Sequence, residues 1–193
     1  MLDLSTRAPV KIARVEQPRY TAIAQALHWL TAALVLAVLP LAWIAVSLPR
    51  DSASKGFFFQ MHKSVGLTIL VIVAVRILWR AWHPAPPEVY VPRALTILGR
   101  INHWLLYLVF LLMPLSGLLL SAAFGSTIQY FYLFPIPPFI EKNKDLADLA
   151  DQVHLAGQYA VYTLVVLHVL ATAWHLVVRR DGLLDRMLPR QDV

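Results

Sequence analysis

The sequence of 193 residues contains no cysteine and few charged residues. The lack of cysteine excludes disulfide bonds, thiolate metal sites and iron–sulfur clusters on this chain, and it excludes covalent haem attachment through a C-x-x-C-H motif. Charged residues make up only 15% of the chain, whereas they make up about a quarter of an ordinary soluble domain. The hydrophobic fraction of 59% and the mean hydropathy of +0.61 point the same way. We therefore expect a membrane protein.

Four long apolar runs account for this composition, at about residues 26–48, 64–82, 105–124 and 153–178. A helix needs about 20 apolar residues to cross a bilayer, and runs of this length are too long for barrel strands. The sequence predicts an all-α integral membrane four-helix bundle, with helices at about 21–48, 60–82, 98–124 and 150–178. These helices would form one domain over residues 19–190, after a cytoplasmic tail of residues 1–18. The aromatic, proline-rich segment 130–140 is expected to be a loop at the membrane interface.

The distribution of lysine and arginine predicts the orientation of the helices. Twelve of the 17 cationic residues lie in or near the two tails and the connection between the second and third runs. These are Arg7, Lys11, Arg14, Arg19, Arg76, Arg80, Arg93, Arg100, Arg179, Arg180, Arg186 and Arg190. The positive-inside rule then places both termini in the cytoplasm. The acidic connection between the third and fourth runs would face the periplasm.

A net charge of +6 and a pI of about 9.8 are compatible with binding either nucleic acid or a membrane surface. Because the cationic residues flank long apolar runs, we expect the lipid bilayer as the partner and no nucleic acid.

Histidines are the most informative residues of the apolar runs. Six of the seven lie in or at the ends of predicted helices, and the set is His28, His62, His83, His103, His154, His168 and His175. Ionisable side chains inside a membrane are costly, so each is a functional candidate. The alternative is a histidine that only forms a hydrogen bond between helices.

The spacing of His154 and His168 indicates two cofactors at different depths. They are 14 residues apart, which is nearly four helical turns, so both project from one face of the fourth helix. A rise of 1.5 Å per residue separates them by about 21 Å. By depth, His62 matches His154 on the periplasmic side, and His28 matches His168 on the cytoplasmic side.

Each histidine pair is suited to hold one b-type haem. Two axial histidines fill both open positions of a haem iron, which favours electron transfer over substrate binding at the metal. Zinc is the competing metal, but a catalytic zinc usually takes three clustered protein ligands. A glycine at position 66, one turn after His62, would let a flat ring approach the helix, although it could equally serve helix packing.

Further polar residues have candidate roles around these pairs. His103 and His175 lie at a similar shallow depth and could hydrogen-bond a quinone carbonyl, or they could form an ordinary interfacial pair. Arg76, Arg80 and Lys63 could pair with haem propionates, whereas as topology anchors they would only fix the orientation. Lys63, next to His62, could also attract an anion such as superoxide.

The sequence resembles the bacterial cytochrome b561 family over roughly residues 19–190. The matching stretches are Arg19-Tyr20, Leu27-His28-Trp29, Met61-His62-Lys63-Ser64-Val65-Gly66, Arg80 before Pro84-Ala85-Pro86-Pro87, His103 to Tyr107 with Pro114 and Gly117, Val153-His154-Leu155-Ala156, Leu167-His168, His175, and Asp181-Gly182-Leu183-Leu184-Asp185-Arg186-Met187. The order, the spacing and the flanking residues agree together, which makes the resemblance specific.

The resemblance implies a four-helix membrane protein with two b haems, whose family ligand positions fall on His28, His62, His154 and His168. It also suggests oxidation of superoxide to dioxygen with ubiquinone as the electron acceptor. We expect electrons to enter on the periplasmic side and leave to a quinone near His175, or to run in the reverse direction from quinol. The alternatives are a haem-bearing anchor subunit for a hydrogenase or another periplasmic redox enzyme, and a membrane protein without redox function, such as a small transporter.

Overall fold

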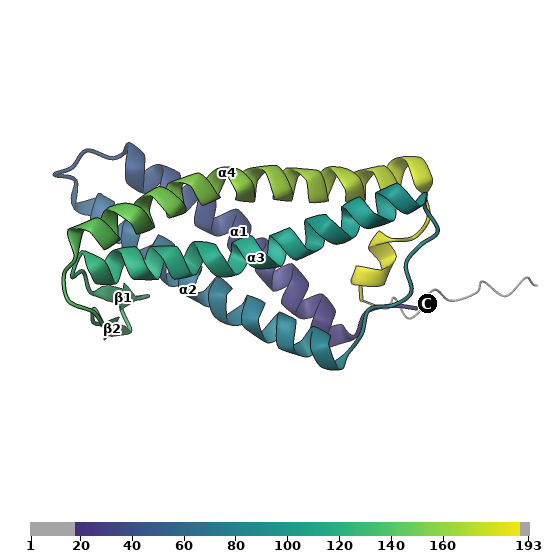
Figure 1. Ribbon diagram of the computed structural model, residues 1–193, viewed down its shortest axis with the longest axis horizontal. Coiled ribbons are helices and arrows are strands. Elements are labelled where there is room, and N and C mark those ends of the chain that lie inside the picture. Colours follow the sequence, from purple (N-terminus) through teal and green to yellow (C-terminus); the bar gives the residue numbers. More distant parts are fainter. Residues whose placement is uncertain (1–17, 190–193) are drawn as a thin grey trace, which may run out of the picture.

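Four long helices dominate the computed structural model, which describes residues 18–189 (Figure 1). They are α1 (Ala22–Ser47), α2 (Ala53–Trp82), α3 (Arg93–Ala123) and α4 (Lys144–Trp174), and α4 continues into a π-helical turn, η1 (His175–Arg179). A short 3-10 helix, η2 (Leu184–Met187), follows near the C-terminus. All four long helices are apolar and long enough to cross a membrane. The predicted all-α four-helix bundle is confirmed, while the expected tail lies outside the described residues except for Pro18.

Three of the helices begin earlier than the apolar runs suggest. Helices α2, α3 and α4 start at Ala53, Arg93 and Lys144, rather than near residues 60, 98 and 150. Their first turns carry polar and charged residues, which form helix readily but lie outside an apolar window. At the start of α4, the side chain of Asn143 accepts a hydrogen bond from the Leu146 N–H at 3.0 Å and caps the helix.

A small β-hairpin interrupts the otherwise helical structure between α3 and α4. Strands β1 (Ile128–Tyr130) and β2 (Phe134–Ile136) are antiparallel, with Ile128 opposite Ile136. Phe131 and Tyr132, which follow β1, have φ values of 46° and 59°. Hairpin turns with positive φ usually contain Gly, Asn or Asp, and neither residue here is one of these. The sequence therefore predicted only a loop over residues 130–140.

Hydrogen bonds from α2 hold the hairpin against the bundle. The buried Ser64 Oγ donates to the Gln60 carbonyl at 2.8 Å and accepts from the Phe131 N–H at 2.8 Å. The Gln60 Oε1 accepts from the Gln129 N–H at 2.9 Å. Gln60 and Ser64 flank His62 along α2, so the hairpin is anchored at the turn that carries this histidine.

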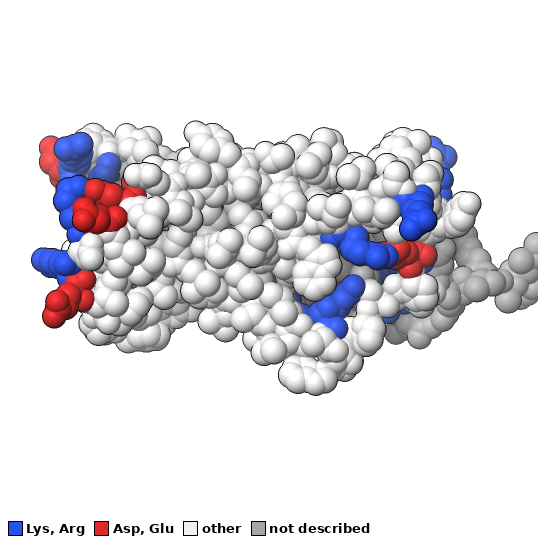
Figure 2. Space-filling model, viewed as in Figure 1, with Lys and Arg blue, Asp and Glu red and all other residues white. Residues whose placement is uncertain are grey.

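The hairpin lies at one end of the bundle, and the two ends of the described chain lie at the other (Figure 1). At the far end from the hairpin, the Tyr20 N–H donates to the Arg186 carbonyl at 3.1 Å, and the Trp29 Nε1 donates to the Met187 carbonyl at 2.7 Å. We call these the hairpin end and the terminal end. Figure 2 shows that the charged side chains on this face gather at the two ends and leave an uncharged band between them.

The interior of the bundle is small, and most apolar side chains face outward. A buried cluster joins α1 to α2 through Val35, Val65, Ile69 and Val73. Large apolar side chains such as Leu36, which is 70% exposed, cover much of the remaining helix surface. An apolar outer surface of this extent is suited to lipid rather than water.

Replacing Ser64 with alanine should destabilise the hairpin. The variant loses the acceptor for the Phe131 N–H, and a lost buried hydrogen bond costs about 1–3 kcal/mol. We expect purified S64A in detergent to aggregate at a lower temperature than the unchanged protein. The matched control is Ser47→Ala, because the exposed Ser47 hydroxyl bonds the Ile44 carbonyl of its own helix and no other group within residues 18–189. Equal midpoints for the two variants would contradict the anchoring role of Ser64.

Candidate functional site

Four of the histidines form two pairs that bridge different helices. His62 of α2 faces His154 of α4, and His28 of α1 faces His168 of α4. The ring centroids are 6.1 Å apart in each pair. Helix α4 therefore supplies one ring to each pair, as the 14-residue spacing predicts.

The separation of the rings fits a metal between them. Two metal–nitrogen bonds of about 2 Å each, together with the distance from each nitrogen to its ring centre, span about 6 Å. Edge-to-face packing of two rings without a metal covers the same range of distances. The hydrogen bonds of the ring nitrogens therefore distinguish a pair suited to hold a metal from a pair that only packs edge to face.

At the hairpin end, both rings are held in the form that ligates a metal. The Nδ1 of His62 lies 3.0 Å from the Val38 carbonyl, and the Nδ1 of His154 lies 3.0 Å from the Met113 carbonyl. A carbonyl only accepts, so each Nδ1 carries the hydrogen and each Nε2 keeps its lone pair. Metal-bound histidines are typically oriented by such a bond from the other ring nitrogen. The donor nitrogens of the hairpin-end pair thus fit a haem iron that His62 and His154 would hold.

Two glycines provide room beside the hairpin-end pair. A Cβ atom added to Gly117 would lie 3.1 Å from the His154 Cε1, so only glycine allows α3 to approach this ring without displacement. At Gly66, one turn after His62, an added Cβ would meet nothing within 4 Å. Sequence reasoning noticed Gly66 but gave no role to Gly117, although the Pro114-x-x-Gly117 spacing was visible.

At the terminal end, the His28–His168 pair has further neighbours. The Arg76 Nη2 lies 3.2 Å from the His28 Nδ1. A guanidinium group only donates, so in this arrangement His28 Nδ1 accepts and its Nε2 carries the hydrogen. For Nε2 to bind a metal, Arg76 must turn to another acceptor. His103 is also close, with its ring centroid 5.3 Å from that of His168, which is shorter than two metal–nitrogen bonds require.

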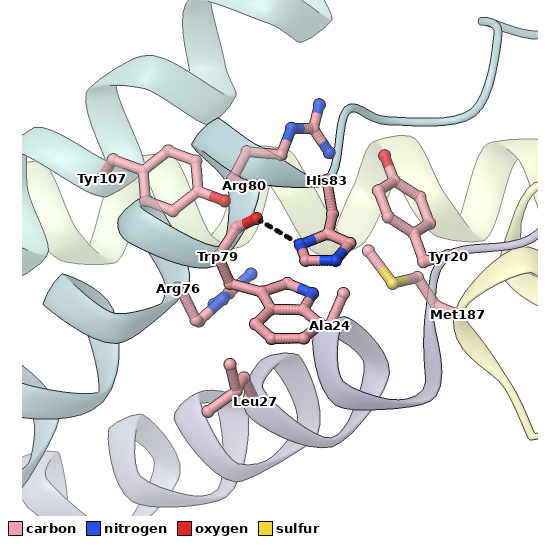
Figure 3. Close-up of a pocket in the computed structure, with 9 residues that line it drawn as sticks. All are labelled: Tyr20, Ala24, Leu27, Arg76, Trp79, Arg80, His83, Tyr107 and Met187. Carbon is pink, nitrogen blue, oxygen red and sulfur yellow. Dashed lines mark hydrogen bonds between the residues drawn. The ribbon is translucent and has the colours of Figure 1, made fainter.

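A pocket lined by Arg76 could hold another acceptor for its guanidinium group. Its lining residues come from α1 and the segment just before it, from α2 and the residue just after it, from α3 and from the C-terminal segment. They are Tyr20, Ala24, Leu27, Arg76, Trp79, Arg80, His83, Tyr107 and Met187 (Figure 3). Within residues 18–189, neither arginine of this pocket has a carboxylate at ion-pair distance. Two guanidinium groups without an acidic partner are suited to bind an anion, such as the carboxylates of a haem.

The predicted quinone residues do not share a contact. His103 lies beside His168, whereas the His175 Nδ1 lies 2.7 Å from the Asp181 Oδ2. Sequence reasoning assigned no role to Asp181, because this residue lies beyond the expected end of the fourth helix at residue 178 and no periodicity relates it to His175. Burial would raise the pKa of the Asp181 carboxyl, but hydrogen bonds from His175, the Leu183 N–H and Arg179 lower this pKa below its ordinary value.

The remaining candidate residues, Lys63 and His83, both belong to the helix α2 region. Lys63 is half-buried beside His62 on α2, and no carboxylate of the described chain pairs with it. His83 ends α2 and stacks on Trp79 with ring centroids 4.0 Å apart, while its Nδ1 bonds the Trp79 carbonyl (Figure 3). His83 therefore takes no part in the two ring pairs.

Four membrane-length helices with histidines paired across them define a helical membrane haem protein. The chain belongs to the prokaryotic cytochrome b561 family, whose sequence profile matches residues 19–190. It is 32% identical to a protein of Yersinia pestis described as probable superoxide oxidase CybB, over 90% of this chain and 97% of the relative. It is also 32% identical to cytochrome b561 homolog 2 of Escherichia coli K12, over 88% of this chain and 91% of the relative.

Membership of this family establishes the general activity. The protein is a multi-pass bacterial membrane protein that binds haem b and transfers electrons. The expected family, fold class and cofactor type are thereby confirmed. The transporter alternative is wrong, because a family of redox haem proteins covers nearly the whole chain.

Alanine substitutions at the four paired histidines should show that each ring pair holds a different haem. We expect His62→Ala or His154→Ala to lose one haem, and His28→Ala or His168→Ala to lose another, because a haem with one axial ligand is held weakly. The haem-to-protein ratio should fall by half in each variant, measured from reduced-minus-oxidised absorption spectra. His103→Ala is the control and should retain all haem. If H103A loses a haem while H28A does not, His168 pairs with His103 instead.

Gly117→Ala should disturb the hairpin-end pair alone. The new methyl group must displace the His154 ring by a few tenths of an ångström, since it would lie 3.1 Å from Cε1. We expect the midpoint potential of one haem to shift and that of the other to stay unchanged in a redox titration. Gly99→Ala on the same helix is the matched control, because its added Cβ meets nothing within 4 Å. Identical titrations for both variants would contradict the close approach.

Proposed function

We propose that this protein is a diheme b-type cytochrome that oxidises superoxide to dioxygen and reduces ubiquinone. In this proposal, His62 and His154 hold one haem b near the hairpin end, and His28 and His168 hold another near the terminal end. The observation that supports it most is the equal separation of 6.1 Å in two ring pairs that share α4. When bound, each haem would supply one-electron chemistry, and the two histidines of each pair would hold its iron.

The proposed net reaction balances in electrons and protons. Two superoxide anions each give up one electron and become dioxygen. One ubiquinone accepts these two electrons and two protons and becomes ubiquinol. The chain itself must attract the anion at one end, admit the quinone from the bilayer, and supply protons to the quinone oxygens.

The charges of the two ends support one orientation for this reaction. At the terminal end, basic residues outnumber acids, and those of the described chain include Arg19, Arg76, Arg80, Arg93, Arg100, Arg179, Arg180 and Arg186. By the positive-inside rule, this end faces the cytoplasm of the bacterial inner membrane, with both termini. The hairpin end then faces the periplasm, where superoxide would arrive.

Lys63 is the residue of the hairpin end best placed to attract superoxide. It adjoins His62 in sequence, is half-buried, and has no acidic partner among the described residues that would neutralise its charge. A positive charge near a site raises the rate at which an anion reaches it. The description of the Yersinia pestis relative as a probable superoxide oxidase agrees with this substrate.

The terminal end is the proposed quinone side. His175 lies seven residues, or two turns, beyond His168, so it is about 10 Å nearer the end of the helix. Its Nδ1 is held by Asp181, which leaves Nε2 for a quinone carbonyl. His103 and Arg76 are secondary candidates, since both lie within the cluster around His28 and His168.

Rapid mixing of the oxidised, detergent-purified protein with superoxide tests this proposal. We expect fast reduction of the haem absorption bands, and turnover when ubiquinone is added. Lys63→Gln should slow the superoxide step severalfold and weaken its dependence on salt, because the local attraction is removed. Lys144→Gln removes the same charge from the same end, at a residue already paired with Asp148, and should leave the rate nearly unchanged.

Two outcomes would overturn the proposal. Haem bands that respond only to an added protein partner would favour the haem-bearing anchor subunit. Haem bands that respond to quinol but never to superoxide would leave an electron carrier with another donor.

A further inference from the structure

The chain beyond α4 folds back so that an aspartate meets the last histidine of the helix. The final turn, His175–Arg179, is a π-helix, and the Arg180 N–H donates to the His175 carbonyl at 2.7 Å. Arg180 then adopts a left-handed conformation with φ of 51°, which turns the chain back toward the helix. Asp181 Oδ2 thereby comes to lie 2.7 Å from the His175 Nδ1.

This histidine–aspartate pair is shielded and fixed by its neighbours. The His175 and Asp181 side chains are 13% and 15% exposed. The Arg179 Nε lies 3.6 Å from the same Asp181 oxygen, and the Arg179 Nη2 donates to the Tyr90 carbonyl at 2.6 Å. The Trp174 ring packs edge-on against His175, with centroids 5.0 Å apart. The carboxylate is therefore held in one position relative to the imidazole.

The role of Asp181 in the turn does not require its contact with His175. The other carboxylate oxygen, Oδ1, accepts from the Leu183 N–H at 3.3 Å and so stabilises the reversal of the chain. Oδ2 is free to face the ring, and its short hydrogen bond to Nδ1 is an additional interaction. An aspartate that hydrogen-bonds Nδ1 fixes the tautomer of a histidine and stabilises the imidazolium that forms when Nε2 takes up a proton.

We propose that Asp181 is a positioning residue that sets His175 to donate a proton from Nε2 to a ubiquinone oxygen. This inference rests on the proposed quinone site at His175. With Nδ1–H held by Asp181, the ring takes a proton at Nε2 from water at the terminal end. As the quinone accepts an electron, the N–H bond at Nε2 breaks and an O–H bond forms on the quinone. The ring returns to the neutral form, still bonded to Asp181, and takes up the next proton.

Asp181→Asn tests this role with little disturbance of the turn. The amide oxygen can keep the bond from the Leu183 N–H, which places the amide NH₂ against His175. An NH₂ group donates, so the ring must accept at Nδ1 and carry its hydrogen at Nε2, which is the wrong tautomer for the relay. The haem-loaded protein is reduced with dithionite without oxygen and mixed with a soluble short-chain ubiquinone, and haem oxidation is followed.

We expect D181N to lower the maximal rate of haem oxidation about 100-fold, as is typical when a proton donor is lost. The ubiquinone concentration at half-maximal rate and the haem content should change little. Asp181→Glu should restore most of the rate, since a carboxylate returns. Asp185→Asn is the matched control, because the exposed Asp185 lies on the same segment, and it should react like the unchanged protein.

The other outcomes separate this inference from the proposed quinone site. If His175→Ala slows haem oxidation while D181N and D181E react at the full rate, the quinone site stands and the role of Asp181 is wrong. If neither H175A nor D181N changes the rate or the half-maximal concentration, both the site and the relay are wrong. If D181N and D181E are equally slow with normal haem content, Asp181 stabilises the fold and does not position His175 for proton donation.

Discussion

Each imidazole placed inside a bilayer needs a partner for both of its nitrogens, and the structure is organised around that need. His62 and His154 each give the Nδ1 hydrogen to a main-chain carbonyl of another helix. These carbonyls, of Val38 and Met113, lie within one turn of the helix-interior prolines Pro40 and Pro114. The other nitrogen of each ring, Nε2, would bind the iron of the proposed haem.

The two ends of the bundle meet this need in different ways. At the hairpin end, Ser64 and the hairpin close over the helix turn of His62, and the rings are set by neutral carbonyls. At the terminal end, Arg76 and His103 crowd the His28–His168 pair, and the hydrogen-bonded His175–Asp181 pair lies beyond it. A fixed, neutral setting suits a centre that only exchanges electrons. A setting rich in charges and proton carriers suits the proposed reduction of a quinone, which consumes protons.

Helical periodicity explains what the sequence could predict. The spacing of 14 residues places His154 and His168 on one face of α4 whatever the packing, and matching depth then selects His62 and His28. Depth alone could not reveal that His103 would lie beside His168, because that contact depends on how α3 packs along α4. The strands that begin at Ile128 and Phe134 are too short to show the alternation of apolar and polar residues that predicts a strand. The contact of Asp181 arises from a π-helical turn, which helical periodicity does not predict.

The central claim is that two histidine pairs of this single chain each hold one haem. Its most direct test is the haem-to-polypeptide ratio of the unchanged protein, purified from cells supplied with ample haem, together with the electron paramagnetic resonance spectrum of the oxidised form. The account predicts two haems per chain, both low-spin with two nitrogen ligands each. A single haem per chain, or a high-spin signal from an iron with an open position, would contradict it.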